Sequence, residues 1–313
     1  MSRRRGRSRG VPAADVEESI GIGLQSLKGS GRLFLERAGA ISIGRMTDQP
    51  AQPGPPDDTA TLEGGASMPL LGFGTWQIKG SDATRATAAA LEAGYRHVDT
   101  ATVYGNEAEV GRALGESGVA RGDLFVTTKC PPNRAGRELE TLRASLEALG
   151  TEYVDLWLIH WSGGDRTDLD MWRAFVDARE QGLARHIGVS NFDVAMVDRL
   201  TSATDVKPAV NQIEWSPLLF DRSVLEDHRA RSVVLEGYSA LRGGTLDHPT
   251  ITGIADRLGR TPAQVIVRWH LQHGIVVIPK SRQADRIRAN ADVGGFQLSD
   301  DDMAALDGLG KQA

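Results

Sequence analysis

The sequence has a single cysteine, Cys130, so no disulfide can form within the chain. It has no group of Cys and His residues at metal-ligand spacing, and we expect no metal site. No apolar run approaches the roughly 18 residues that a membrane-spanning helix needs, and no segment resembles a secretory signal. These absences predict a cytoplasmic protein with no membrane partner.

Acidic residues outnumber basic ones beyond the first 45 residues. Residues 1–45 hold nine Arg or Lys and four Asp or Glu, a net charge of +5, so the remaining residues carry −10 and the whole chain −5. A basic nucleic-acid-binding surface is therefore excluded for most of the chain. The Arg cluster of residues 3–9 has no aromatic residues interleaved for stacking on bases, and we expect no nucleic acid partner.

Residues 47–58 are rich in Pro and Asp and resemble a disordered linker. We therefore divide the chain into a disordered basic leader and linker, residues 1–58, and one folded domain, residues 59–313. Met46 stands directly before the linker and is a candidate for the true start of translation. The intact mass of the native N-terminus would decide this.

Short apolar segments alternate with longer amphipathic ones throughout the folded part. The expected strands are residues 70–75, 95–100, 124–129, 154–160, 185–190, 209–214, 232–239 and 275–280. The expected helices start at or near Ser81, Asn106, Arg134, Asp168, Asp193, Asp221, Thr261 and Gln283. Eight such units in about 250 residues predict an α/β protein with a (β/α)8 TIM barrel. A Gly-Gly turn within residues 60–69 predicts a β-hairpin that plugs the bottom of the barrel.

Local helix signals support this assignment. Thr261, followed by Pro262 and by Gln264, forms a capping box with proline at the first helical position. Ser299 before three aspartates predicts another helix start.

Reactive side chains gather at the expected strand ends, where parallel barrels carry their active sites. Asp99 ends the second strand and Tyr104 follows it, Lys129 ends the third, and His160 ends the fourth. A phenol with an ordinary pKa of about 10 becomes a useful acid near neutrality when an ammonium lowers that pKa, here by about 3 units. Asp99 would hold Lys129, and His160 would orient a carbonyl. This set predicts carbonyl reduction.

The chain resembles the aldo-keto reductases, and among them the bacterial members similar to 2,5-diketo-D-gluconate reductase. The resemblance runs from about residue 60 to 310 through GFGTW (72–76), VDTATVYGNE (98–107), TTK (127–129), DLWLIHW (155–161), GVSNF (188–192), NQIEWSP (211–217), YSAL (238–241) and IPKSRQADRIRAN (278–290). It implies a monomeric NADP(H)-dependent oxidoreductase acting on CH-OH groups, with a small-molecule carbonyl substrate. It also implies that Asp99, Tyr104, Lys129 and His160 are the catalytic tetrad.

The resemblance implies a cofactor site without a Rossmann domain, and the chain has no intact G-x-G-x-x-G. The implied cofactor-binding residues are Gly74, Thr75, Ser190, Asn191, Gln212, Tyr238, Ser239, Leu241, Lys280, Ser281, Arg286 and Asn290. The turn at Arg242 resembles the loop that covers the pyrophosphate. The cationic and hydroxyl groups near residue 280 suit a 2′-phosphate, hence NADPH over NADH.

The chain departs from the family pattern in two places. Ala289 stands where a glutamate usually contacts the adenine ribose, and the C-terminal loop that closes the pocket is almost absent. We therefore expect an open pocket walled by Trp76, Tyr104, His160 and Trp161. Such a pocket favours small aldehydes, ketoacids or sugar-derived dicarbonyls.

Each of these residues also has a structural explanation when taken alone, as a helix cap, a packed aromatic ring or a surface charge. Trp161, Trp215 and Trp269 are expected to be at least partly core. Two alternative functions stay open: an inactive cofactor-binding barrel with a regulatory role, and a lyase or isomerase using Lys129 as a Schiff-base nucleophile. A hydrolase is rejected because the segment around Ser190 lacks the closing glycine of a nucleophile elbow.

Overall fold

The computed structural model describes residue 56 and residues 58–310. Apart from residues 56 and 58, the predicted leader and linker, including Met46, lie outside the described residues. No helix in the described part of the chain is long and apolar enough to cross a membrane.

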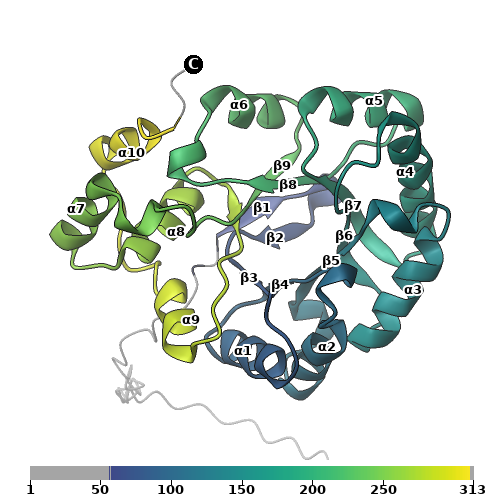
Figure 1. Ribbon diagram of the computed structural model, residues 1–313, viewed down its shortest axis with the longest axis horizontal. Helices are drawn as coiled ribbons and strands as arrows, with labels where there is room; N and C mark the ends of the chain where they lie inside the picture. Colours follow the sequence, from purple (N-terminus) through teal and green to yellow (C-terminus); the bar gives the residue numbers. More distant parts are fainter. Residues whose placement is uncertain (1–55, 57, 311–313) are drawn as a thin grey trace, which may run out of the picture. The chain divides into compact units, whose positions relative to one another are not determined.

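Eight parallel strands form the centre of the fold, and Figure 1 shows them as a ring surrounded by helices. They are β3 Gly72–Gly74, β4 His97–Asp99, β5 Phe125–Cys130, β6 Val154–Ile159, β7 Ala184–Ser190, β8 Val210–Glu214, β9 Val234–Tyr238 and β10 Val276–Val277. Each strand pairs with the next in chain order, and a parallel bridge between Leu71 and Val277 joins the first to the last. The predicted (β/α)8 barrel is confirmed.

The helices follow the strands as predicted, with two differences. They are α1 Ser81–Glu92, α2 Glu107–Glu116, α3 Glu138–Leu149, α4 Asp165–Glu180, α5 Val194–Thr204, α6 Arg222–Ala230, α7 Pro249–Leu258, α8 Pro262–Gln272, α9 Ala284–Ala291 and α10 Asp300–Asp307. The helix expected from Arg134 begins at Glu138, because the preceding residues Pro132–Arg134 form a separate 3-10 turn. Helix α7 was not predicted.

Helix α7 is hard to predict from the sequence because several of its residues have low helix propensity. It contains Gly253 and the β-branched Thr250, Ile251 and Thr252, all of low helix propensity. Its ends are nonetheless well defined, by Pro249 in the first turn and by Gly259 at φ 62°. The capping boxes at Thr261 and Ser299 are both present, so these two sequence predictions are confirmed.

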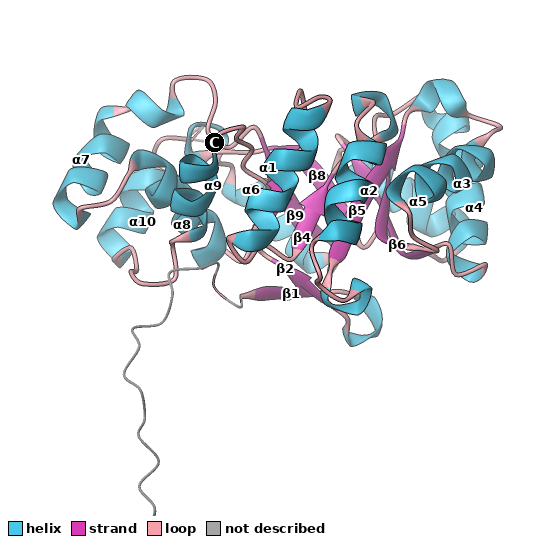
Figure 2. Cartoon of the chain, turned by 90° about the horizontal axis from the view of Figure 1, so that it is seen from below, coloured by secondary structure: helices cyan, strands magenta, loops and turns pink. Residues whose placement is uncertain are grey.

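The predicted hairpin is formed by β1 Thr59–Thr61 and β2 Ser67–Pro69, which pair antiparallel. Gly64 and Gly65 between them take φ values of 77° and 83°, which residues with a Cβ rarely adopt. Because β2 leads directly into β3, the hairpin lies at the N-terminal end of the barrel, below the parallel strands in Figure 2. Met68 is fully buried there in the same apolar cluster as Phe73.

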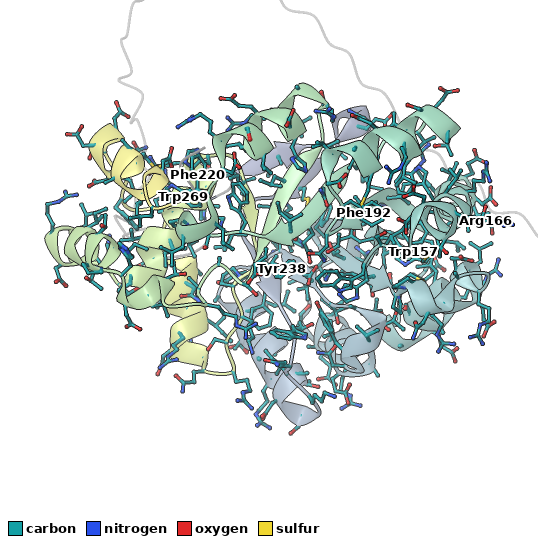
Figure 3. All side chains as sticks on the ribbon, turned by 45° about the horizontal axis from the view of Figure 1, so that its top comes forward. Trp157, Arg166, Phe192, Phe220, Tyr238 and Trp269 are labelled. Carbon is teal, nitrogen blue, oxygen red and sulfur yellow. The ribbon has the colours of Figure 1, made fainter. Side chains whose placement is uncertain are left out.

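Large aromatic rings fill the layer between the strands and the outer helices. Trp157 of β6 stacks on Phe175 of α4 with ring centroids 3.6 Å apart, and Trp269 of α8 is also fully buried. In Figure 3 both tryptophans lie away from the centre of the ring, whereas Tyr238 lies near the centre. The apolar packing therefore leaves the carboxyl ends of the strands to polar side chains.

Candidate active site

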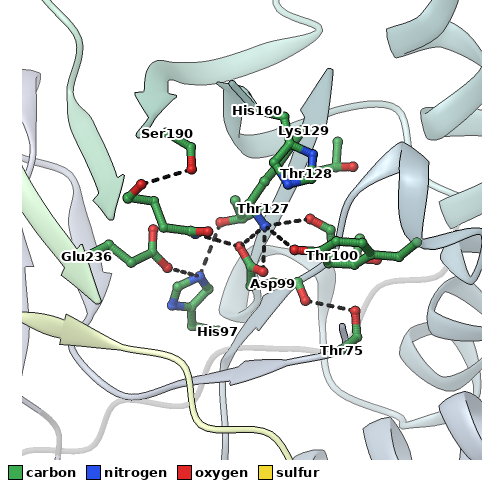
Figure 4. A network of polar contacts seen from close by, with 12 residues as sticks. Thr75, His97, Asp99, Thr100, Thr127, Thr128, Lys129, His160, Ser190 and Glu236 are labelled. Atoms are coloured by element: carbon green, nitrogen blue, oxygen red, sulfur yellow. Dashed lines mark hydrogen bonds and ion pairs between the residues drawn. The ribbon is translucent and has the colours of Figure 1, made fainter. Parts of the chain in front are cut away.

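The four predicted reactive groups meet at the carboxyl ends of neighbouring strands. Lys129 of β5 places its Nζ 2.6 Å from both carboxylate oxygens of Asp99, at the end of β4. The same Nζ lies 2.9 Å from the Thr100 carbonyl oxygen and 3.5 Å from the Tyr104 hydroxyl (Figure 4). Tyr104 comes from the 3-10 turn Thr102–Tyr104, and His160 directly follows β6. The fully buried ammonium is thus fixed between a carboxylate and a phenol.

Lys129 keeps its charge in this position. Burial by itself would lower the pKa of Lys129, but the charge of Asp99, followed by Tyr104, raises it, and the net direction is upward. A buried ammonium this well partnered is a permanent cation near neutral pH.

The pKa of Tyr104 is raised, and the sequence-based expectation of a lowered value was wrong for the protein without its ligands. Burial of the phenol is the largest cause, and the opposing effect of Lys129 is smaller. Lys129 lies closer to Asp99, at 2.6 Å, than to the Tyr104 hydroxyl, at 3.5 Å, so much of its positive charge is already compensated. The Tyr104 hydroxyl therefore keeps its proton near neutral pH.

His160 stands beside Tyr104 as a neutral imidazole. The two rings meet edge to face with centroids 5.7 Å apart. Burial, followed by the charge of Lys129, lowers the pKa of His160 to about 3. Its Nδ1 is buried without a hydrogen-bond partner among the described residues. If the proton of the neutral ring is on Nε2, the unpartnered Nδ1 buries only a lone pair and not an N–H donor. This tautomer therefore has the smaller cost of burial.

This neutral histidine predicts a pH-dependent stability difference. In the unfolded chain the pKa of a histidine is about 6.5, so acid favours unfolding as pH falls from that value toward the folded value of about 3. The advantage of wild type over His160→Gln in unfolding free energy should therefore shrink by about 2 kcal/mol from about pH 7 to about pH 5. Urea denaturation of both proteins at both pH values measures this. An unchanged difference would show that His160 titrates normally.

Buried polar residues fix the backbone around this cluster. Thr75 donates its hydroxyl to the Asp99 carbonyl oxygen at 2.9 Å. Asn106 donates to the carbonyl oxygens of Thr75 and Ile78 at 3.0 and 2.8 Å and accepts from the Thr100 hydroxyl at 2.8 Å. From the sequence, Asn106 was expected at a helix start, and no role in the site was predicted for it. Its place directly before α2, two residues after Tyr104, was the available signal.

A second polar group continues from this cluster across β7, β8 and β9. Ser190 donates its hydroxyl to the Gln212 carbonyl oxygen at 2.8 Å, and Asn191 accepts from the Tyr238 hydroxyl at 2.7 Å. Gln212 donates its side-chain amide to Asp99 at 2.9 Å. These predicted cofactor-binding residues are therefore connected to the Asp99–Lys129 pair through the side chain of Gln212.

Both groups lie at one cavity of about 860 Å³. All but two of the predicted site residues line it: Gly74, Trp76, Asp99, Tyr104, His160, Trp161, Ser190, Asn191, Gln212, Tyr238, Ser239, Leu241, Lys280, Ser281, Arg286 and Asn290. Lys129 and Thr75 are not in the lining, and both are buried beneath it. Lining residues without a predicted role include Val103, Glu214, Leu246 and Asp247.

The outer rim of the cavity is aromatic and open. Trp76 and Trp161 are 38% and 51% exposed. The expectation that Trp161 would be partly core was wrong, because the side chain projects from the loop after β6, whereas Trp215 and Trp269 are buried as expected. Arg242 and Lys280 lie 5.1 and 5.7 Å from the centroid of the Trp76 ring.

Cationic side chains without acidic partners lie in the part of the cavity lining formed by residues 280–290. Within the described residues, Lys280 and Arg286 form no ion pair with a carboxylate within 4.0 Å. Burial, followed by the nearby charges of Arg282 and Arg242, lowers the pKa of Lys280. Like charges held together without counter-charges fit a bound phosphate dianion. This part of the lining therefore fits the phosphates of NADP(H), and it includes Ala289.

Three residues near the cavity adopt backbone conformations that side chains normally avoid. Gln77, Asn191 and Ser239, which follow β3, β7 and β9, have φ values of 62°, 62° and 58°. Asn191 and Ser239 line the cavity, and Gln77 accepts a hydrogen bond from Lys280 at 3.3 Å. Such strain persists where the surrounding structure enforces it, most often at functional sites.

Comparison with known proteins agrees with this geometry. The profile described as the Aldo/keto reductase family matches residues 70–311. The chain is 48% identical over 255 residues to an aldo-keto reductase of Mycolicibacterium vanbaalenii, covering 80% of this chain and 91% of the relative. A relative of the same name from Mycolicibacterium smegmatis is 46% identical over 255 residues, covering 80% and 90%.

Solved structures give the same result. An aldo/keto reductase from Brucella melitensis has a TM-score of 0.78 at 42% identity, covering 80% of this chain and 98% of that one. An aldo-keto reductase of Bombyx mori, solved in complex with NADP, has a TM-score of 0.75 at 33% identity, covering 82% and 93%. The family profile, the relatives and the solved structures all name the same family, and the chain belongs to the aldo/keto reductase family.

Proposed function

We propose that this protein reduces aldehydes and ketones to alcohols with NADPH, with Tyr104 as the proton donor. Carbonyl reduction with NADP(H) as cofactor follows from membership of the family, so that sequence prediction is confirmed. The observation that carries the finer proposal is the position of Lys129 between Asp99 and Tyr104, two residues that line a cavity together with cations that form no ion pair within the described residues.

The proposed chemistry follows from the state of each side chain. When bound, NADPH would supply the hydride that the carbonyl carbon accepts. Tyr104 gives its proton to the carbonyl oxygen, and its raised pKa ensures that the proton is present. Lys129 stabilises the phenolate that remains, and Asp99 keeps the ammonium in place. The neutral His160 donates a hydrogen bond that orients the substrate oxygen.

The rim supports the proposed substrate classes, which are small aldehydes, ketoacids and sugar-derived dicarbonyls. Trp76 and Trp161 offer exposed rings for the carbon skeleton. We further propose that the enzyme works as a cytoplasmic monomer.

A substrate screen that follows NADPH absorbance tests the proposal, with NADH as the control cofactor. We expect consumption of NADPH that depends on added carbonyl compound, fastest with the three classes named. If no carbonyl compound accelerates consumption while NADPH binds normally, the barrel is an inactive cofactor-binding protein.

Cofactor preference gives a second test at the residues proposed to bind the phosphates. Arg286→Ala should weaken NADPH binding by about 10- to 100-fold, because a charge-assisted hydrogen bond to the 2′-phosphate is lost. NADH binding should change by less than about twofold, since NADH has no such phosphate. Fluorescence titration measures both affinities. Arg288→Ala, on the same helix but paired with Asp285 and absent from the cavity lining, is the matched control. Equal losses for both cofactors in Arg286→Ala would refute the assignment.

A further inference from the structure

Two titratable side chains lie inside the barrel behind the Asp99–Lys129 pair and have no role in the chemistry above. Glu236 of β9 and His97 of β4 are both fully buried, and His97 Nε2 lies 3.8 Å from Glu236 Oε1. In Figure 4 they lie on one side of Asp99. Neither residue was predicted from the sequence to belong to the site.

Gly72 leaves the space that lets the His97 ring approach Glu236. His97 and Glu236 come from strands that are separated in the barrel by β3 and β10. A Cβ added at Gly72 of β3 would lie 2.8 Å from His97 Cγ, which is closer than atoms can approach. On β10, Val276 pairs with Glu236. The His97 ring therefore occupies the space that a side chain at position 72 would fill.

The charges and hydrogen-bond donors around Glu236 favour its protonated form. This part of the barrel holds two carboxyl groups, Asp99 and Glu236, and one ammonium, Lys129. Asp99 receives Lys129 at 2.6 Å on both oxygens and the Gln212 amide at 2.9 Å. Neither oxygen of Glu236 has a hydrogen-bond partner of good geometry among the described residues, and the nearby Gln212 amide, which partly favours the charged form, already donates to Asp99. An ionised carboxylate without donors is costly to bury, so the neutral acid is favoured.

His97 does not supply the missing cation. Burial, followed by the charge of Lys129, lowers the pKa of His97 to about 3, so the ring is neutral. For Glu236, burial and then the charge of Asp99 raise the pKa to about 8, against smaller opposing effects of Lys129 and Gln212. The direction of this shift agrees with the count of donors.

The other titratable groups around Glu236 lie on β4, β5 and β8 and in the turn that contains Tyr104. Asp99 on β4 and Lys129 on β5 form the ion pair, and Tyr104 beyond them is a neutral phenol. Toward the carboxyl ends of the strands, Glu214 on β8 pairs with Tyr238 on β9, two residues beyond the pairing of Gln212 with Glu236. The neighbouring positions on β10 and β3 are Val276 and Gly72, which do not titrate.

We propose that Glu236 is a positioning residue for the Lys129–Tyr104 pair, protonated when the reductase works near neutral pH and inhibitory when it ionises. This inference rests on the proposed function of Tyr104. A negative charge on Glu236 raises the pKa of both Tyr104 and Lys129. It would therefore oppose the phenolate that Tyr104 becomes during reduction, and turnover would fall as Glu236 loses its proton.

The test compares the pH dependence of kcat in wild type and Glu236→Gln, since glutamine resembles the neutral acid and cannot ionise. From about pH 7 to about pH 9, kcat of wild type should fall by about fivefold or more, and that of Glu236→Gln by less than about twofold. At about pH 7 the two should differ by less than about threefold. KM for NADPH should be alike in both, which a merely structural role would not predict.

Glu107→Gln is the matched control. Glu107 is another buried carboxyl with a raised pKa, but its oxygens accept from Thr128 at 2.6 Å and from Ser145 at 3.2 Å. This variant should keep the alkaline fall of wild type. An alkaline fall that persists in Glu236→Gln, or a loss of more than about tenfold at about pH 7, would overturn the inference.

Infrared spectroscopy of the wild type gives an independent measurement should Glu236→Gln fail to fold. The carbonyl band of a buried neutral carboxyl should be present at about pH 7 and vanish by about pH 9. If no such band disappears over this range, the inference is wrong. The role of Tyr104 is tested separately, by Tyr104→Phe near neutral pH, so failure of either idea can be recognised.

Discussion

Replacement of Tyr104 by phenylalanine is expected to lower kcat for carbonyl reduction by about 10³-fold, within the range of general acid catalysis. The hydroxyl is 3.5 Å from Lys129 Nζ and borders the cavity, and no other phenol in the described part of the chain approaches that ammonium as a hydrogen-bond partner. The ring itself would keep its edge-to-face contact with His160. Loss of one oxygen should therefore remove the proton donor and preserve the pocket.

NADPH binding provides the internal control for this variant. Fluorescence titration should give an affinity within about threefold of wild type, because the residues proposed to bind the phosphates, Lys280 and Arg286, are left unchanged in the cavity lining. Tyr153→Phe is the matched substitution, since the Tyr153 ring lies between Arg121 and Arg185 at 4.0 and 3.9 Å, outside the cavity lining. It should keep full turnover. Retention of more than about a tenth of kcat in Tyr104→Phe would exclude Tyr104 as the essential acid.

The sequence identified residues that the structure brings together because strand ends are local features. Asp99, Lys129 and His160 each end an apolar segment, and parallel strands bring such ends to one rim. The ion pair of Asp99 with Lys129 follows, since β4 and β5 are neighbours in both chain order and space. The unpaired cations near Lys280 were likewise visible as a short motif.

Features that depend on distant contacts were missed. Glu236 meets His97 across two intervening strands, and only the folded barrel shows that Gly72 leaves room for this. An acidic residue within the apolar run of β9, directly before Gly237, was the one available signal. The direction of the Tyr104 pKa was wrong for a related reason, since burial depends on the whole fold and here outweighs the charge of one neighbour.

The buried ion pair allows stability to be separated from catalysis. Lys129→Met should destabilise the protein by about 3–5 kcal/mol, because Asp99 would be left buried and charged with only the Gln212 amide as a side-chain donor. Asp99→Asn/Lys129→Met removes both charges and should recover more than half of that loss. Urea denaturation measures the free energies of unfolding of wild type and of both variants.

Turnover should behave differently from stability in the same set of proteins. Both variants lack the cation that stabilises the Tyr104 phenolate, so both should lose about 10²-fold or more in kcat, however well the double variant folds. Recovery of stability without recovery of kcat would assign the ammonium a chemical role beyond holding the barrel together. Recovery of both would mean that the pair acts only by maintaining the shape of the site, since the double variant restores packing and has no charge at position 129.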